Sequence, residues 1–397
     1  MTVPVLCGRD AERLLAGEPP VTAEALIYLG WSRWVEFLRA EYLDGFIAEG
    51  GAKVKLLVGS PGSGKSHQLA LAAAAGRESG YLVAQVNARL AERVFPLDRL
   101  YGELMRSIDL KEVVHRLCGI IVREVGYQPE EVPSGERFLE WVEREGGVPR
   151  APLERRLLEA IGKVAREPAF DLAFGTAIAH LAADHLGYRL LNEAEAGALW
   201  RWLLGAKVSL SELRPLRLYK RVDRHTARGA LRSLAALALQ AGYRGLVVCA
   251  DNLDALLERD PETGRLRYTR GVRDEAYEAI RELIDDVDEA SATLYLFAGR
   301  RTVLEDEKTG ISSYEALRLR LVPEVRANHF NPYADLVDLD LARALDYLSA
   351  ADLQELAARA AALAPSVRGL AAGLPPPEVP ASPGEIRQVV MEGITRG

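Results

Sequence analysis

Short runs of apolar residues alternate with long amphipathic stretches along the chain. Four runs have the length and content of buried strands, namely residues 53–58, 81–87, 246–250 and 293–299. Between them, across about residues 95–240, apolar residues recur at spacings of three and four, which predicts helices. Buried strands joined by helical crossovers predict an α/β fold, with a three-layer core around a parallel sheet.

The same pattern divides the chain into four parts. We expect the N-terminal segment and the first half of the core in residues 1–94, and a large helical insertion in residues 95–240. The second half of the core would occupy residues 241–340, and a small helical lid residues 341–397. Prolines between residues 129 and 168 predict that the insertion consists of several separate helices.

The composition is that of an ordinary globular chain, with 49% hydrophobic and 27% charged residues. The net charge of -7 means that any contact with nucleic acid would need a local basic patch. Cys7, Cys118 and Cys249 lie far apart, which argues against a disulfide framework or a zinc site. No signal peptide is visible and no apolar stretch reaches membrane-spanning length, so we expect a cytoplasmic protein without a membrane partner.

The stretch after the first predicted strand is a full match to G-x-x-x-x-G-K-[ST], the phosphate-binding loop. Backbone N–H groups and a helix N-terminus would surround the phosphates of ATP. Lys65 would reach the β- and γ-phosphates, and the Ser66 hydroxyl would bind Mg²⁺. A plain glycine-rich turn is the alternative interpretation. The candidate nucleotide-binding residues are Gly59, Ser60, Pro61, Gly62, Ser63, Gly64, Lys65, Ser66 and His67.

A phosphate-binding loop also needs a carboxylate at the end of a neighbouring strand, to hold the metal's water shell. Asp251 follows the run at 246–250 and is the candidate, so Ser66 and Asp251 form the predicted metal site. A strand-end Asp that caps a loop is the alternative. The run at 293–299 fits a strand between these two, and Arg300 stands where comparable ATPases place a polar residue that orients water.

Two further arginines are candidates for contacts with ATP. Arg320, with Arg318 as an alternative, resembles an arginine finger that reaches a neighbouring subunit's γ-phosphate, which would require a homo-oligomer. Arg387 resembles a lid arginine that reaches back to the nucleotide. A solvated arginine on a helix is the alternative for each. Trp31, near the N-terminus, would either stack on adenine or pack in the core.

A cluster of seven basic residues with few acidic neighbours lies between residues 214 and 232. It would track a DNA backbone, or it forms a solvated helix face. Its members are Arg214, Arg217, Lys220, Arg221, Arg224, Arg228 and Arg232.

Several segments together resemble a known family, the ATP-binding proteins of BREX phage-defence systems, of the BrxD type. The most specific are residues 199–205 (Leu-Trp-Arg-Trp-Leu-Leu-Gly) and 241–246 (Ala-Gly-Tyr-Arg-Gly-Leu). The family is similar to AAA+ ATPases, so the resemblance implies an AAA+-like P-loop ATPase whose partners are a helicase or other defence proteins. The remaining matching segments are Leu213-Arg214, 231–235, 283–285, 297–299 and 314–317.

The chain departs from that family's pattern at one place. The family has Asp-Glu-x-Glu after the strand, whereas this chain has Asp251-Asn252-Leu253-Asp254. An amide cannot act as a base at neutral pH, so the water-polarising role at Asn252 would pass to Asp254 or be lost. We therefore expect catalytic roles for Lys65, Asp251, Asn252, Asp254 and Arg320 in an ATP-dependent switch or motor with slow hydrolysis. A non-hydrolysing scaffold stabilised by ATP is the alternative, and a small-molecule kinase is a weaker one.

Overall fold

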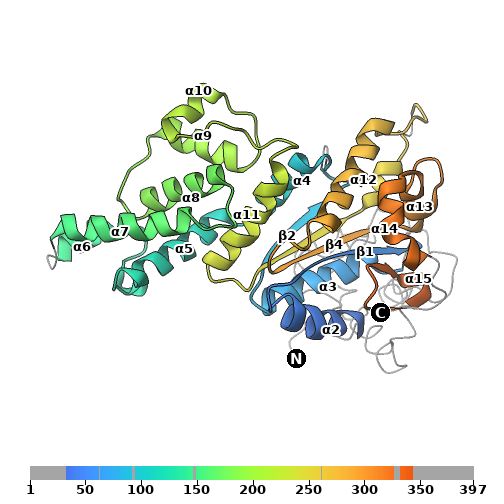
Figure 1. The fold of residues 1–397 in the computed structure, drawn as a ribbon, viewed down its shortest axis with the longest axis horizontal. Coiled ribbons are helices and arrows are strands. Elements are labelled where there is room, and N and C mark those ends of the chain that lie inside the picture. The colour runs from blue at the N-terminus through green and yellow to red at the C-terminus, as the bar shows by residue number, and fades with distance from the viewer. Residues whose placement is uncertain are drawn as a thin grey trace, which may run out of the picture.

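The computed structural model has a five-stranded sheet at its centre, and all of its neighbouring strands run parallel (Figure 1). The described residues are 33–61, 63–91, 94–145, 149–260, 262–325 and 331–342. The strand order is β2-β3-β4-β1-β5. The strands are β1 (Ala52–Gly59), β2 (Leu82–Asn87), β3 (Leu246–Asp251), β4 (Thr293–Arg300) and β5 (Leu336–Asp338). The predicted α/β class with a parallel sheet is confirmed, and it is compatible with the core of a P-loop nucleotide-binding protein.

Alternate residues of each strand point to opposite faces of the sheet, and each face has its own apolar core. On one face Leu57, Val247 and Leu296 pack with residues of α3 and of the helical segment before β1. On the other face Val58, Val248 and Phe297 pack with the helices between β2 and β3 and with α12. The sheet is thus the middle of three layers, as the apolar runs predict.

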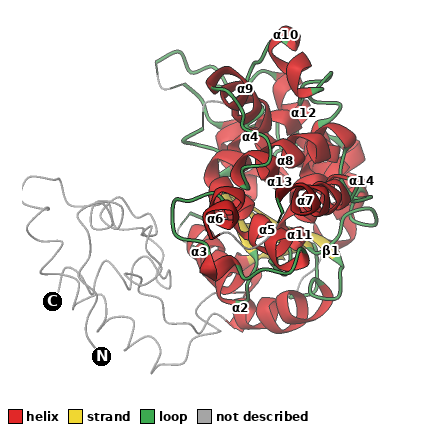
Figure 2. Ribbon diagram, turned by 90° about the vertical axis from the view of Figure 1, so that its left-hand side faces the viewer, coloured by secondary structure: helices red, strands yellow, loops and turns green. Residues whose placement is uncertain are grey.

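The helices account for most of the described chain (Figure 2). Those around the sheet are α2 (Arg33–Phe37), the π-helix η2 (Leu38–Phe46), α3 (Lys65–Glu78), α12 (Arg270–Asp285), α13 (Arg301–Glu305), α14 (Glu315–Val325) and α15 (Leu339–Ala342). Short 3₁₀ helices are η5 (Leu253–Leu257) and η6 (Ile311–Ser313). None of the helices in the described ranges is long and apolar enough to cross a membrane.

A series of helices separates β2 from β3 and extends away from the sheet (Figure 1). The first and last of them, α4 and α11, lie against the sheet, while α5 to α10 form a bundle beside it. The series comprises α4 (Leu97–Ser107), α5 (Leu110–Glu124), η3 (Pro129–Glu131), α6 (Phe138–Glu145), α7 (Arg150–Ala165), α8 (Leu172–His185), α9 (Glu193–Leu203), α10 (Leu210–Leu213), η4 (Arg214–Leu216) and α11 (Ala227–Gln240).

The edge strand β5 has no counterpart among the predicted strands, since three residues are too few to show a period. A buried lysine of β1 binds the segment that leads into β5. Lys55 of β1 is fully buried, and its ammonium donates to the carbonyl oxygens of Pro332, Tyr333 and Ala334 at 3.2, 3.2 and 2.8 Å. The same ammonium lies 4.4 Å from the ring centroid of Tyr42. These contacts compensate the buried charge and fix β5 beside β1.

Candidate nucleotide-binding site

The loop between β1 and α3 contains the predicted phosphate-binding residues, and a side chain would be strained or crowded at two of its glycines. Gly64 has φ 89°, in the left-handed region, immediately before Lys65 begins α3. A Cβ atom on Gly59 would lie 2.5 Å from the Ser63 Oγ, so a side chain there would disrupt the loop. Gly62 lies outside the described residues.

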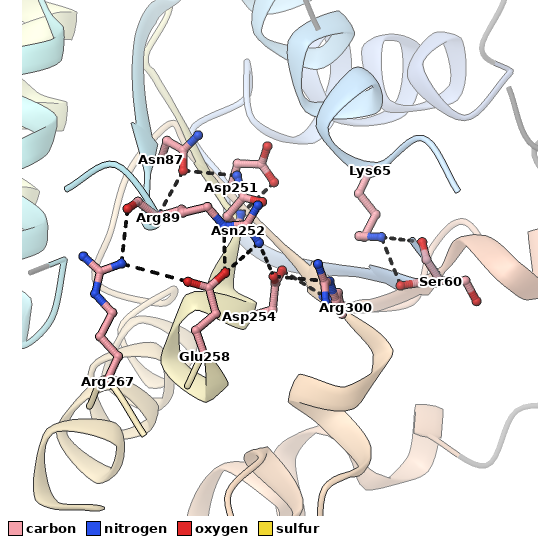
Figure 3. Close-up of polar contacts among 11 residues, drawn as sticks. Ser60, Lys65, Asn87, Arg89, Asp251, Asn252, Asp254, Glu258, Arg267 and Arg300 are labelled. Carbon is pink, nitrogen blue, oxygen red and sulfur yellow. Dashed lines mark hydrogen bonds and ion pairs between the residues drawn. The ribbon is translucent and has the colours of Figure 1, made fainter. Parts of the chain in front are cut away.

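Lys65 folds back over its own loop (Figure 3). Its Nζ donates to the carbonyl oxygens of Gly59 and Ser60 at 3.0 and 2.7 Å and to the Ser63 hydroxyl at 3.3 Å. Burial lowers the pKa of Lys65, while nearby carboxylates, Asp254 foremost, act in the opposite direction. The ammonium is therefore held by neutral oxygens of the loop, which an anionic phosphate would outcompete as partners.

Asp251 ends β3 and pairs in register with Asn87, the last residue of β2. Its carboxylate accepts a hydrogen bond at 2.7 Å from the backbone N–H of Asn252. Burial raises the pKa of Asp251, and the nearby Ser66 hydroxyl opposes that shift. The two residues predicted to hold a metal, Ser66 and Asp251, thus lie near enough to influence each other although they are distant in the sequence.

Asn252 adopts a left-handed backbone conformation, with φ 61° and ψ 42°. Asparagine tolerates this region better than most residues with a side chain. Its Nδ2 donates to the Asn87 Oδ1 at 3.1 Å, and the same oxygen accepts the Arg89 backbone N–H at 3.0 Å. The Asn252 amide is therefore bonded to the end of β2.

Asp254 is nearly buried, with 7% of its side chain exposed, and two arginines compensate its charge (Figure 3). The Arg89 Nη2 lies 3.0 Å and the Arg300 Nε 3.4 Å from its Oδ2. Arg89 also donates through Nε to Glu258 at 2.7 Å. Two guanidinium groups beside a carboxylate favour its charged form, so they weaken it as a base for water.

Arg300 is the last residue of β4 and the register partner of Gly59, where the predicted phosphate-binding loop begins. The strand that it ends lies between β1 and β3, as the sequence predicts. Its side chain is 48% exposed beyond the contact with Asp254. The exposed Arg300 guanidinium therefore lies at the same edge of the sheet as the ends of β1 and β3, next to the β1–α3 loop.

A carboxylate that sequence reasoning missed also contacts the loop. The Asp340 side chain accepts the Ser60 backbone N–H at 3.0 and 2.9 Å and the Ser60 hydroxyl at 2.9 Å. Arg301 lies between it and Asp338, with nitrogen–oxygen distances of 3.7 and 2.8 Å respectively. The sequence feature that could have pointed to Asp340 is the Asp-x-Asp pattern that follows the apolar residues of β5.

The other predicted residues fall in different places. His67 lies in the first turn of α3, where burial lowers its pKa to about 4, so its ring is neutral at physiological pH. Arg320, on α14, pairs with Asp285 of α12 and donates to the Ala316 carbonyl oxygen at 2.6 Å. Trp31 and Arg387 lie outside the described residues.

No group of three or more His, Cys, Asp or Glu side chains suited to a metal ion occurs in the described part of the chain. A Mg²⁺ ion that is bound together with a nucleotide does not need such a group, because phosphates and water supply most of its ligands. The proximity of Ser66 to Asp251 is compatible with that kind of site. The metal itself remains a proposal.

Comparison with known proteins gives a single finding. The family model described as BREX system ATP-binding protein BrxC/D matches residues 11–371, nearly the whole chain. Neither the curated proteins nor the solved structures that were compared include a match to this chain. The match spans the loop with Lys65, the strand that ends in Asp251, and the whole helical insertion. The chain therefore belongs to the BREX system ATP-binding protein BrxC/D family.

Proposed function

We propose that this chain binds ATP with Mg²⁺ at Gly59–Ser66 and acts as an ATP-dependent switch or motor subunit in phage defence. Membership of the family supports an ATP-binding role in such a system. The main observation that supports this site is that three neighbouring strands end at the same edge of the sheet. β1 ends in the glycine-rich loop, β3 in Asp251 and β4 in Arg300, and β4 lies between the other two strands. In this sheet the strand that precedes the loop, β1, lies between β4 and β5, and this strand order is compatible with that of AAA+ ATPases.

Each side chain at this edge has a defined role in the proposal. Bound Mg²⁺ would withdraw electron density from the phosphates, with Ser66 as a ligand and Asp251 orienting its water shell. Lys65 would exchange the carbonyl oxygens of Gly59 and Ser60 for phosphate oxygens. Arg300 would neutralise charge that develops on the terminal phosphate.

Replacement of Lys65 tests the site directly. Lys65→Ala removes the cation that faces the phosphates, so affinity for a fluorescent ATP analogue should fall at least about 100-fold, equivalent to about 3 kcal/mol. Lys308→Ala is the matched control, because Lys308 is exposed on a loop after α13 and carries the same charge. Equal affinity of the Lys65→Ala protein and the unmodified protein would disprove the site.

The same geometry supports slow hydrolysis. The Asn252 amide is bonded to Asn87, and the Asp254 carboxylate is shared by Arg89 and Arg300. The residue at 252 is therefore no base, and the two arginines weaken Asp254 as one. A scaffold that keeps ATP without hydrolysing it is the second candidate, and these contacts favour it too. Single-turnover measurements distinguish the two, since a switch releases ADP at a rate that partner proteins raise, whereas a scaffold retains ATP.

The proposed partners are other proteins of a BREX system, a helicase among them, together with DNA. A homo-oligomer is proposed through Arg320, which would act across a subunit boundary. In the isolated chain Arg320 is engaged by Asp285, so a neighbouring γ-phosphate would have to replace that carboxylate. Mixtures of Arg320→Ala and Lys65→Ala subunits should then recover part of the activity that each variant lacks. A protein that remains monomeric with ATP and DNA would contradict this arrangement.

A further inference from the structure

The basic cluster between residues 214 and 232 divides into two parts in the structure. Its later members face acidic residues of α12 and of the turn after it. Arg224 lies 3.9 Å from Glu275, and Arg228 and Arg232 lie 3.6 and 3.2 Å from Asp286. This half of the cluster is compensated within the chain, and its positive charge is not free for a phosphate backbone.

The earlier members behave differently. Arg214, Arg217, Lys220 and Arg221 are exposed, and none forms an ion pair with any residue that the structure describes. Tyr219 lies among them with 69% of its surface exposed, which is unusual for a large aromatic side chain. We call residues 214–221 the basic-aromatic segment. It joins α10 to the turn before α11, on the helical insertion (Figure 1).

The backbone of this segment is anchored in the insertion. Leu213, Leu216 and Leu218 are completely buried and alternate with the exposed side chains. The Trp202 Nε1–H donates to the Lys220 carbonyl oxygen at 2.7 Å. The His180 Nε2–H donates to the Leu216 carbonyl oxygen at 2.9 Å. Anchoring on both sides of Tyr219 presents the exposed side chains from a rigid support.

Arg217 shows how the backbone directs its side chains. Its φ of 54° and ψ of 30° lie in the left-handed region, which costs about 1 kcal/mol or more for a residue with a Cβ. Its N–H closes the 3₁₀ turn on the Arg214 carbonyl oxygen at 2.9 Å, and the Leu218 N–H then bonds to the Leu213 carbonyl oxygen at 3.1 Å. The chain reverses here, which buries Leu216 and Leu218 and leaves Arg217 in solvent.

We infer that the basic-aromatic segment is a binding surface for single-stranded nucleic acid, with phosphates on Arg214, Arg217, Lys220 and Arg221 and a base stacked on Tyr219. Unpaired cations beside an exposed aromatic ring are the combination that binds single strands without sequence preference. A duplex would use only the cations, because its bases are already stacked. The inference does not rest on the nucleotide site, which lies at the sheet edge.

Fluorescence anisotropy with a labelled oligothymidylate of about 20 nucleotides tests this surface. Tyr219→Ala removes the contact with one stacked base, so oligonucleotide affinity should fall about 5- to 100-fold. Tyr219→Phe retains the aromatic ring and should retain the affinity. Four phosphate contacts predict a salt slope near about −3, so affinity should fall about 50-fold between 50 and 200 mM salt. The triple variant with alanine at Arg217, Lys220 and Arg221 should bind weakly and lose most of this slope.

The control variant carries alanine at Arg224, Arg228 and Arg232, which removes the same charge from the compensated half. It should bind the oligonucleotide as the unmodified protein does. Equal losses in the two triple variants would show an effect of net charge and overturn the proposal. So would a Tyr219→Ala protein that binds normally, or a polyglutamate that competes as well as unlabelled oligothymidylate, which would indicate an acidic protein partner. The Lys65→Ala protein should keep its oligonucleotide affinity, so failure here is distinguishable from failure of the ATP site.

Discussion

Replacement of Asp254 by asparagine distinguishes a structural carboxylate from a reactive one. The substitution keeps the size of the side chain and removes the charge that Arg89 and Arg300 share at 3.0 and 3.4 Å. Loss of a charge-assisted hydrogen bond costs about 1.5–3 kcal/mol. Removal of a charge that is only 7% exposed offsets part of this, because that charge no longer has to be desolvated.

The two arginines also limit the damage to stability. Arg89 keeps Glu258 at 2.7 Å, and both guanidinium groups remain in contact with water, with exposed fractions of 38% and 48%. We therefore expect the free energy of unfolding to fall by about 1 kcal/mol, measured by urea denaturation. A loss of more than about 4 kcal/mol would mean that the unpaired arginines are far less solvated than the structure shows.

The effect on hydrolysis separates the two roles. If Asp254 accepts the proton of the attacking water, Asp254→Asn should lower the turnover of ATP by at least about 100-fold without lowering ATP affinity. Arg89→Gln frees the same carboxylate of one cation and should raise turnover. Glu258→Gln is the matched control, because it removes a partner of Arg89 without touching Asp254. Unchanged turnover in Asp254→Asn, together with a loss of stability, would refute a role as base.

Three further predictions follow from the site and from the helices around it. Asn252→Glu should raise turnover despite a cost of about 1 kcal/mol for its left-handed backbone, whereas Asn252→Gln, of equal length but uncharged, should not; equal rates would place the base elsewhere. Asp340→Asn removes a negative charge near Lys65, so titration with an ATP analogue should show a few-fold higher affinity, and a lower affinity would mean that the carboxylate organises the loop. Hydrogen bonds from Arg281 and Tyr314 lower the pKa of Glu278 to about 2. Because that pKa is depressed on folding, its stabilisation is complete above about pH 4.3 and is lost as the pH falls toward 2, and urea midpoints of Glu278→Gln should lack this part of the pH dependence.

The amino-acid sequence by itself determined the features that depend on local order. The glycine spacing before Lys65 and Ser66 predicts a tight loop between a strand and a helix, and the left-handed Gly64 at the start of α3 agrees with it. The long strands are also readable, since each is a run of residues buried on both faces. Predicted runs at 246–250 and 293–299 match β3 and β4 to within one residue.

Only the tertiary structure decided what depends on contacts between distant residues. Lys55 donates to the carbonyl oxygens before β5, and Ser60 of the loop donates to Asp340; in both cases the sequence gives no indication of the partner. The partners of a charged residue are likewise invisible in sequence, because acidic residues of α12 come far after the basic cluster that they compensate. Hydrophobic periodicity encodes which side of an element is buried, whereas the pairing of charges is settled only when the elements have packed. That packing is what leaves Arg217 and Tyr219 exposed and binds Asp254 to two arginines.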